Sequence, residues 1–171
     1  MIRLLFAGSF DPVTYGHQEI IARASRICDE LLVGVAMNTE KRYWFSQADR
    51  IQMIERIVGK FSNIKVIGVD AMLAEKARAL EVTALVRGAR NATDFDAEVA
   101  MADINQELNP ELDTILIPGG ELRHVSSSAV RAMAKSGATA AQLSKFVPDF
   151  VATRLVQRAS TMVLDDIIRA F

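Results

Sequence analysis

Residues 2–28 constrain the fold more than any other part of the chain. An apolar run of strand length and composition, residues 2–7, leads into a turn-rich segment with Gly8, Pro12 and Gly16. Beyond it, apolar side chains recur at helical spacing: Ile20, Ile21, Ala24, Ile27 and Cys28. The stretch therefore predicts a strand, a glycine loop and a helix over residues 17–28, with His17 in the first turn of that helix.

A helix that starts after a glycine loop is suited to bind an anion. Its first backbone N–H groups are free and form the positive end of the helix dipole. Gly8 would let a polyphosphate approach the backbone, and Ser9 offers a hydroxyl. His17 can donate a hydrogen bond to an oxygen that gains charge in a transition state. The alternative is an ordinary strand, turn and helix with a surface histidine, but the spacing Thr14-x-Gly16-His17 favours the functional interpretation.

Composition and charge exclude several classes of function. The chain has 171 residues, half of them hydrophobic, and a net charge of −1, so we expect a soluble globular domain that binds neither nucleic acid nor membranes through general electrostatic attraction. No signal peptide or membrane-spanning stretch is apparent. The single cysteine, expected as a buried core thiol, allows no internal disulfide and suits the cytoplasm. His17 and His124 lack a zinc-binding spacing.

The rest of the chain alternates apolar strand-like runs with helical patterns. After residues 2–7, we expect strands at residues 30–36, 64–68, 83–86 and 113–117, separated by helices. This order predicts an α/β fold, a Rossmann-like, doubly wound five-stranded parallel sheet with C-terminal helices. Residues 1–160 would form one domain. Residues 161–171 would be an amphipathic tail of uncertain role, docked on the core or on a neighbouring subunit.

Groups that suit phosphate follow several of the predicted strands. Lys41 and Arg42 lie after the second strand, and Arg87-Gly88-Ala89-Arg90 follows the fourth. In parallel α/β sheets this edge binds ligands. Residues 126–128 are serines at a predicted helix start, where they would cap the helix or hold an anion. Glu98 fits a helix-surface charge and a ligand-facing acid equally well.

Three common types of site are missing from the sequence. No Gly-x-Gly-x-x-Gly follows the first strand, no Gly-x-x-x-x-Gly-Lys-Ser/Thr occurs, and neither histidine has a Gly-x-Ser-x-Gly partner. The cationic and hydroxyl groups suit phosphoryl or nucleotidyl transfer, which depends on positioning and charge stabilisation more than on covalent catalysis.

The first motif, Gly8-Ser9-Phe10-Asp11-Pro12 with Thr14-x-Gly16-His17, resembles the signature of the nucleotidylyltransferase superfamily. Lys41, Arg87-Gly88-Ala89-Arg90, Glu98 and Val125-Ser126-Ser127-Ser128-x-Val130-Arg131 follow in the order seen in bacterial phosphopantetheine adenylyltransferases. The resemblance covers roughly residues 2–160. It implies transfer of AMP from ATP to 4′-phosphopantetheine, giving dephospho-coenzyme A and pyrophosphate.

The resemblance also implies roles for individual residues. His17 and Lys41 would be catalytic, with His17 stabilising the transition state. The residues expected to contact 4′-phosphopantetheine are Ser9, Lys41, Leu73 and Arg87. Those expected to contact ATP are Ser9, Phe10, His17, Gly88, Ala89, Arg90, Glu98, Leu122, Arg123, His124, Val125, Ser126, Ser127 and Ser128. Mg²⁺ would be held by ATP phosphates with no protein ligand. A homohexamer is implied, and feedback by coenzyme A is left open.

The sequence departs from the family pattern at Ala7, Ser9, Tyr15, Ala89 and Val125, none of which removes a catalytic group. The effect of Tyr15 and Ala89 on the shape of the pocket is left open.

Two other functions compete with the one implied. One is a sister cytidylyl- or adenylyltransferase that acts on an alcohol phosphate or a nicotinamide mononucleotide. The other is a non-catalytic nucleotide-binding or assembly protein on the same scaffold.

Overall fold

The computed structural model of the protein describes residues 1–38, 40–122 and 124–169, and of residues 165–169 the backbone alone. Strands and helices alternate up to the fifth strand, and the chain is helical after it. In chain order the elements are β1 (Arg3–Gly8), α1 (Tyr15–Ala24), β2 (Glu30–Ala36), α2 (Gln47–Val58), β3 (Ile64–Val69), α3 (Leu73–Ala79), β4 (Ala84–Ala89), α4 (Ala92–Leu108), β5 (Asp113–Pro118), α5 (Ser127–Lys135), α6 (Ala140–Leu143) and α7 (Asp149–Arg169).

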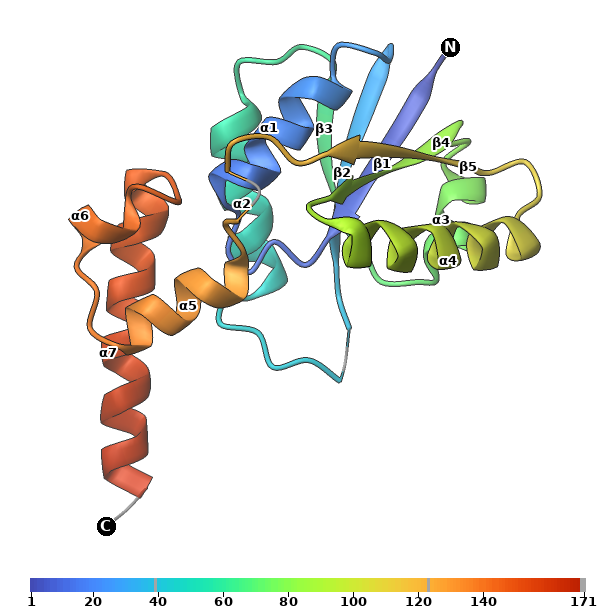
Figure 1. Ribbon diagram of the computed structural model, residues 1–171. Coiled ribbons are helices and arrows are strands. Elements are labelled where there is room, and N and C mark those ends of the chain that lie inside the picture. Colours follow the sequence, from blue (N-terminus) through green and yellow to red (C-terminus); the bar gives the residue numbers. More distant parts are fainter. Residues whose placement is uncertain (39, 123, 170–171) are drawn as a thin grey trace.

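The strands form one parallel sheet in the order β3-β2-β1-β4-β5, with α1 and α2 on one face and α3 and α4 on the other (Figure 1). In the central strand, Leu4 is in register with Leu31 of β2 and with Ala84 of β4. Apolar runs without polar alternation favour such central parallel strands, because helices cover both faces. The predicted doubly wound five-stranded parallel sheet is confirmed.

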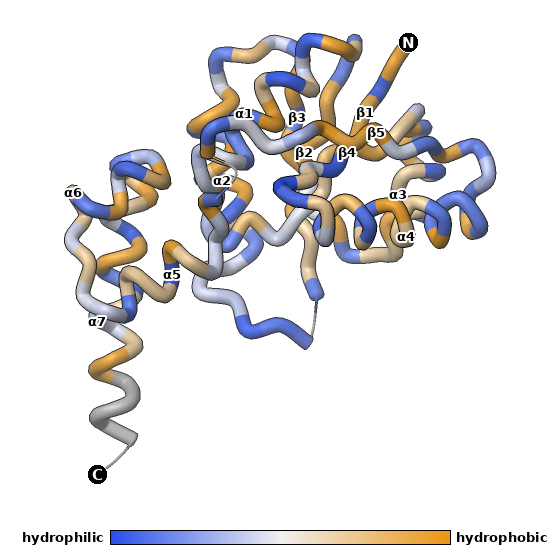
Figure 2. Tube along the Cα trace, viewed as in Figure 1, coloured by the Kyte–Doolittle hydropathy of each residue, from blue (hydrophilic) through white to orange (hydrophobic). Residues whose placement is uncertain are grey.

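Successive side chains of β1 enter two different cores. Leu4 and Phe6 pack with α1, α2 and the C-terminal helices, whereas Leu5 and Ala7 pack with α3. This alternation follows from the period of two in a strand. Figure 2 shows hydrophobic residues along the strands and a hydrophilic loop between β2 and α2, which protrudes from the sheet.

The chain leaves β1 for α1 and leaves the adjacent β4 for α4, which lies on the opposite face of the sheet (Figure 1). When the connections that follow two neighbouring parallel strands run to opposite faces of the sheet, a crevice forms at the C-terminal ends of those strands. Gly8 ends β1, and Arg87 and Gly88 belong to the last half of β4. The fold therefore brings the first motif and the Arg87–Arg90 segment to one edge.

Polar side chains fix the starts of the helices around this edge. Thr14, Ser46, Asn91 and Ser126 each accept a hydrogen bond from the backbone N–H three residues later, at the starts of α1, α2, α4 and α5. At α1 the cap is reciprocal and forms a capping box, because the His17 side chain accepts a hydrogen bond from the Thr14 backbone N–H. Capping thus fixes the orientation of a candidate catalytic ring.

The first helix is shorter than the predicted span of residues 17–28. It ends at Ala24, and the backbone N–H of Ser25, its C-cap, bonds back to Ile21 and Arg23. The chain then turns toward β2, which leaves Ile27 51% exposed. Cys28 packs against the core as expected but is only half-buried, so the expectation of a buried thiol was wrong.

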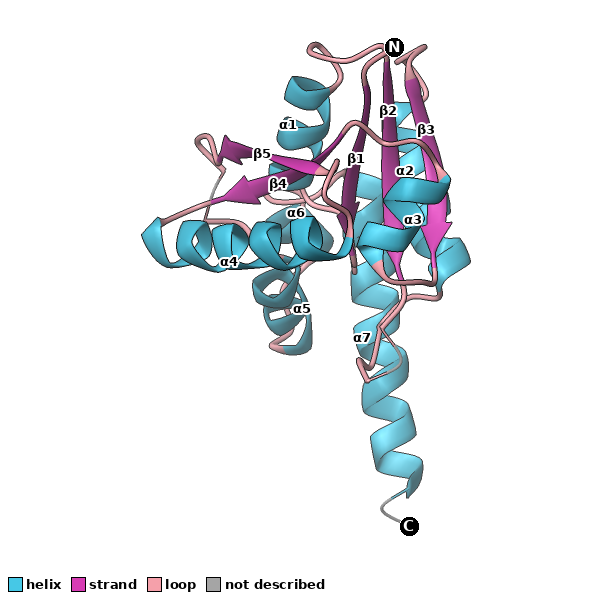
Figure 3. Cartoon of the chain, turned by 90° about the vertical axis from the view of Figure 1, so that its right-hand side faces the viewer, coloured by secondary structure: helices cyan, strands magenta, loops and turns pink. Residues whose placement is uncertain are grey.

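The C-terminal helices pack beside the sheet, and α7 extends well beyond it (Figure 3). The helix runs from Asp149 to Arg169 and does not break at residue 160, where the sequence suggested a boundary. The backbone of residues 161–169 therefore continues α7, while residues 170–171 of the predicted tail lie outside the described residues. In the described part of the chain, no helix combines the length and apolarity needed to cross a membrane.

Candidate active site

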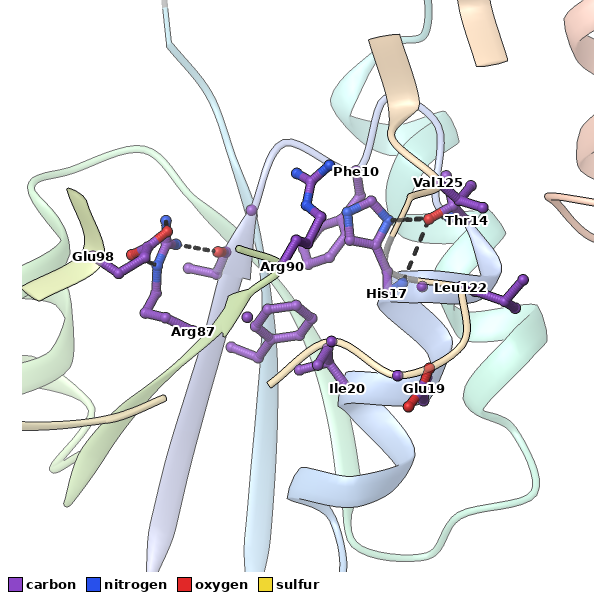
Figure 4. A pocket seen from close by; sticks show the side chains of 17 residues that line it. Phe10, Thr14, His17, Glu19, Ile20, Arg87, Arg90, Glu98, Leu122 and Val125 are labelled. Atoms are coloured by element: carbon purple, nitrogen blue, oxygen red, sulfur yellow. Dashed lines mark hydrogen bonds and ion pairs between the residues drawn. The ribbon is translucent and has the colours of Figure 1, made fainter. Parts of the chain in front are cut away.

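His17 is held by its own helix cap. The backbone N–H of Thr14 donates to Nδ1 of His17 at 3.0 Å. The Thr14 hydroxyl lies 3.1 Å from the same nitrogen (Figure 4). A backbone N–H can only donate, so Nδ1 must accept, and the proton of the neutral ring resides on Nε2. The Phe10 ring packs edge-on against the imidazole, with centroids 5.0 Å apart. The ring therefore keeps one tautomer, with Nε2–H as its free donor.

The environment keeps this imidazole neutral. Burial, and after it the positive charge of Arg90, lower the pKa of His17 to about 4. In Figure 4 the Arg90 guanidinium lies beside the His17 ring. Near neutral pH the ring is therefore a neutral hydrogen-bond donor through Nε2–H and lacks the second proton that a general acid would transfer.

Phe10 explains part of the conformation of the glycine loop. Its φ is 47°, in the left-handed region, and its side chain is only 2% exposed. A side chain at Gly8 would meet the Phe10 ring at 3.2 Å. The absence of a side chain at Gly8 therefore makes room for the Phe10 ring. It would also allow a ligand to approach the backbone.

A first cavity lies between β1, α1, the end of β4 and the segment after β5. Many of the predicted ATP ligands line it together: Phe10, His17, Gly88, Arg90, Glu98, Leu122 and Val125. Its walls are apolar near Ile20 and Gly88 and cationic near Arg90. An apolar slot beside a cationic group suits a base joined to phosphates.

A second cavity lies between the loop after β2, the start of α3 and one face of α4. All four residues predicted to contact 4′-phosphopantetheine line it: Ser9, Lys41, Leu73 and Arg87. Lys41 borders this cavity and not the one that contains His17. Apolar side chains of α4, including Met101 and Ile104, form the rest of the wall. A ligand with a charged end and a long uncharged arm fits such a lining.

Arg87 and Glu98 form the boundary between the cavities, and both line each of them. The Glu98 carboxylate accepts from Nε and Nη2 of Arg87 at 2.6 and 2.9 Å, and Nη1 of Arg87 donates to the Ala7 carbonyl at 2.8 Å (Figure 4). Glu98, which the sequence left open, faces the site. The guanidinium predicted to capture phosphate is already paired with a carboxylate.

Of the other predicted ATP ligands, Ser9 lines the second cavity, whereas Ala89, His124 and residues 126–128 line neither cavity. Ser126 caps α5, Ser128 bonds to Ser126, and Ser127 donates to the Pro12 carbonyl at 2.8 Å. The described contacts of the serine run are therefore structural. Ala89 lines a smaller neighbouring hollow, His124 is exposed, and Arg123 lies outside the described residues.

Sequence reasoning missed two groups that shape the site. Thr14 orients His17, and the spacing of Thr14 and His17 as a capping box was the signal that could have revealed this. Arg50 is fully buried beneath the glycine loop, although an arginine on an amphipathic helix normally faces solvent. Nothing in the local sequence pattern indicates its burial.

The described residues contain no group of three or more histidine, cysteine, aspartate or glutamate side chains arranged to hold a metal ion. The donors around the two cavities are instead hydroxyl, imidazole and cationic groups, which suit phosphate oxygens. The arrangement can bind two phosphorylated molecules side by side, with a neutral hydrogen-bond donor at one of them.

Comparison with known proteins agrees with this arrangement. The chain matches the model of the Cytidylyltransferase-like family over residues 5–133. A putative nicotinate-nucleotide adenylyltransferase from Vibrio parahaemolyticus shares the fold, with a TM-score of 0.66 at 17% identity, covering 93% of this chain and 94% of that one. The Plasmodium falciparum nicotinic acid mononucleotide adenylyltransferase complexed with NaAD gives 0.64 at 15% identity, covering 92% and 96%. Fold and family define the class as α/β nucleotidyltransferases.

Relatives at higher identity narrow this class. The phosphopantetheine adenylyltransferase of Caldanaerobacter subterraneus subsp. tengcongensis is 39% identical over 155 residues, covering 90% of this chain and 95% of that one. Those of Levilactobacillus brevis and Methylococcus capsulatus are 38% and 35% identical, covering 90% and 92% of this chain and 94% and 96% of theirs. This chain belongs to the phosphopantetheine adenylyltransferase family.

Proposed function

We propose that this enzyme transfers AMP from ATP to 4′-phosphopantetheine and releases dephospho-coenzyme A and pyrophosphate. A phosphate oxygen of the acceptor attacks the α-phosphorus of ATP in line with the leaving group. A new P–O bond forms as the bond from the α-phosphorus to the bridging oxygen breaks, and the electron pair leaves with pyrophosphate. Such a transfer needs alignment and charge stabilisation, with no covalent enzyme intermediate.

The fixed tautomer of His17 is the observation that carries this proposal. Negative charge builds on the non-bridging oxygens of the α-phosphate as the acceptor attacks, and Nε2–H would donate to one of them. Because Thr14 already holds Nδ1, the donor needs no reorientation during the reaction. A neutral imidazole with a pKa of about 4 suits hydrogen-bond donation and does not suit proton transfer near pH 7.

The two cavities support the assignment of two substrates. ATP would place its adenosine in the first cavity, with Arg90 near its phosphates, and the acceptor would occupy the second, with its phosphate toward Ser9, Lys41 and Arg87. The cavities share Ala7, Gly8, Arg87 and Glu98 as walls, so the acceptor phosphate and the α-phosphate would meet at this boundary.

We include Mg²⁺ in this proposal as an ion held by phosphate oxygens of ATP. Oxygen ligands from phosphates suit this hard cation, and when bound it neutralises charge on the phosphates. The protein residues act on the phosphates themselves. Arg90 and Lys41 add positive charge near the bound phosphates, and Ser9 offers a neutral donor.

A homohexamer in the cytoplasm completes the proposal. Along α4, the side chains of Phe95, Val99, Met101, Ile104 and Leu108 are each more than a third exposed, which supports an assembly that covers this helix. The single thiol, Cys28, suits a reducing compartment. Control by coenzyme A would follow from competition for the second cavity.

A panel of acceptors tests the reaction. Pyrophosphate release from ATP and Mg²⁺ is measured with 4′-phosphopantetheine, nicotinamide mononucleotide, nicotinic acid mononucleotide and glycerol 3-phosphate. We expect turnover with the first alone. Turnover with a mononucleotide, and none with 4′-phosphopantetheine, would assign a sister activity. No turnover with any acceptor, despite ATP binding, would favour a non-catalytic role.

A further inference from the structure

Arg50 of α2 is a buried charge. Its side chain is 0% exposed. Among the described residues, no carboxylate forms an ion pair with its guanidinium within 4.0 Å. Burying a cation in this way is costly unless hydrogen bonds replace its water. Burial lowers the pKa of Arg50, but a guanidinium stays charged in proteins.

Backbone carbonyls from three segments replace the lost water. Nη1 of Arg50 donates to the carbonyls of Ser9 and Ala36 at 2.5 and 3.0 Å, and Nε donates to the carbonyl of Ser46 at 3.3 Å. These carbonyls belong to the glycine loop, the end of β2 and the start of α2. One planar group therefore ties the glycine loop to both ends of the loop between β2 and α2.

The other contacts of Arg50 lie on the loop between β2 and α2. Its Nη2 donates to Sδ of Met37 at 3.0 Å, and the Tyr43 ring covers the guanidinium with the centroid 4.1 Å from Cζ. The Arg50 side chain hydrogen-bonds to or stacks on five residues, of which four also line the second cavity: Ser9, Ala36, Met37 and Tyr43. Arg50 thus lies directly behind the wall of that cavity.

The same loop is tied to the glycine loop at its far end. The buried Asp11 carboxylate accepts from the backbone N–H groups of Trp44 and Phe45 at 2.9 and 3.0 Å. Arg50 contacts the start of the loop at Ala36 and Met37, and its guanidinium stacks against the Tyr43 ring. Lys41 lies in the exposed stretch between these two ties. Its position relative to Ser9 is consequently set by contacts that Lys41 does not make itself.

We propose that Arg50 is a positioning residue for the phosphate of the acceptor in the second cavity. It fixes the glycine loop, and with it the Ser9 hydroxyl, relative to the loop that carries Lys41, and it places a positive charge behind the wall between them. A phosphate dianion bound to Ser9 and Lys41 would feel that charge through a poorly hydrated wall. The inference rests on the proposed function, since it assigns Arg50 to that acceptor.

Binding of each substrate alone to Arg50→Lys and Arg50→Met tests this role. Isothermal titration calorimetry would measure the affinities for 4′-phosphopantetheine and for ATP without Mg²⁺. Lysine keeps the charge, but its donors lie on one nitrogen and do not reproduce the planar spacing of Nε and Nη1. We expect the acceptor affinity to fall about tenfold in Arg50→Lys and further in Arg50→Met, because small displacements of binding groups have large effects. The ATP affinity should stay within about threefold in both variants.

Arg56→Met is the matched control, because Arg56 lies on the same helix and stacks on Phe150, away from both cavities. It should leave both affinities unchanged. Equal losses for ATP and acceptor in the Arg50 variants would mean a general structural role and would overturn the inference. An unchanged acceptor affinity would also overturn it. If the wild-type protein itself fails to bind 4′-phosphopantetheine, the proposed function fails instead.

Tyr43→Leu keeps the inference testable if the Arg50 variants do not fold. It removes the ring that covers the guanidinium, and the hydroxyl that accepts from the Asn38 backbone N–H, but leaves the buried carbonyl contacts. Comparing 4′-phosphopantetheine with pantetheine separates the two roles of Tyr43, because a direct apolar contact affects both ligands. We expect a selective loss, about threefold or more, for the phosphorylated ligand. Equal losses, or none, in Tyr43→Leu would overturn the inference.

Discussion

The backbone N–H of Thr14 and Nδ1 of His17 are joined by a 3.0 Å hydrogen bond. This bond belongs to the cap of α1, so the conditions that start the helix also fix the tautomer of the ring. In water, either nitrogen of a neutral imidazole can carry the proton. Here only Nε2 remains free to donate, and the ring lines the first cavity. One hydrogen bond therefore both caps α1 and fixes the nitrogen through which His17 can donate.

Replacing His17 should lower turnover far more than ATP binding. In His17→Ala we expect kcat to fall about 10²–10³-fold, as when one donor to a developing negative charge is removed. The affinity for ATP, measured by calorimetry, should change little, because the bond strengthens mainly in the transition state. His17→Gln is the informative comparison, since its side-chain amide brings a neutral donor near the position of Nε2.

Turnover in His17→Gln should exceed that in His17→Ala by about tenfold or more, since one neutral donor replaces another. Equal turnover in the two variants would argue that the imidazole acts as an acid, a base or a cation. The same assay on Arg56→Met provides a control, because Arg56 is exposed and lines neither cavity.

The pH dependence of kcat offers a second test of the neutral ring. With the pKa of His17 lowered to about 4, the ring stays neutral from pH 5.5 upward. We expect no inflection of kcat between pH 5.5 and 7.5 that depends on His17. An ordinary histidine would titrate near pH 6.5 and produce one there. Steady-state rates at saturating substrates, compared between wild type and His17→Gln, would reveal such an inflection.

The same shift predicts a loss of stability in acid. The unfolded chain binds a proton at His17 near pH 6.5, whereas the folded chain resists protonation down to about pH 4. The contribution of neutral, buried His17 to the free energy of unfolding is therefore full above pH 6.5, and it is lost as the pH falls toward 4. Urea unfolding at pH 7 and 4.5 should show a drop in the free energy of unfolding that is about 2 kcal/mol smaller in His17→Gln than in wild type. An equal drop in both proteins would contradict the lowered pKa.

Local patterns in the sequence were sufficient to predict the sheet, but not the details of the site. Apolar runs and glycine turns located all five strands, and the motif spacing placed His17 at a helix start. The end of α1 was predicted too late, because Ile27 continues the helical spacing although the chain has already turned. Apolar spacing reports which side chains could share a face, and not where backbone hydrogen bonds stop.

The groups that sequence reasoning missed act through tertiary contacts. Arg50 has the local pattern of an exposed helix residue, and its burial depends on carbonyls 14 and 41 positions away. Similarly, the pairing of Glu98 with Arg87 depends on α4 folding back over β4. The serine run was open to two interpretations. The structure shows that Ser126 caps α5 and that Ser127 bonds to the Pro12 carbonyl, while contact of these serines with ATP stays a prediction.

Removing the charge of Glu98 should free Arg87 for a phosphate. The carboxylate accepts from two nitrogens of Arg87, and a neutral amide accepts more weakly. In Glu98→Gln we expect 4′-phosphopantetheine to bind about threefold tighter or more, measured by calorimetry without ATP. The matched control is Glu30→Gln, whose carboxylate pairs with Arg3 and Lys65 at the opposite end of β2. Weaker binding in Glu98→Gln would mean that the pair holds Arg87 in its productive position.

Gly34 of β2 offers a test of packing between the strands and helices that position the site. A Cβ atom there would approach Cγ2 of Val69 to 2.8 Å and Cδ1 of Leu5 to 3.0 Å. Crowding of this kind in a packed core typically costs about 1–3 kcal/mol. Gly34→Ala should therefore lower the free energy of unfolding in urea by that amount, because Leu5 and Val69 must shift. Gly59→Ala is the control, since its Cβ would meet only the Glu55 carbonyl, at 3.4 Å, at the end of α2. A Gly34→Ala protein as stable as wild type would show that the packing around Leu5 and Val69 accommodates an extra methyl group. The KM values of this variant would then report whether Ser9 and the glycine loop moved in response.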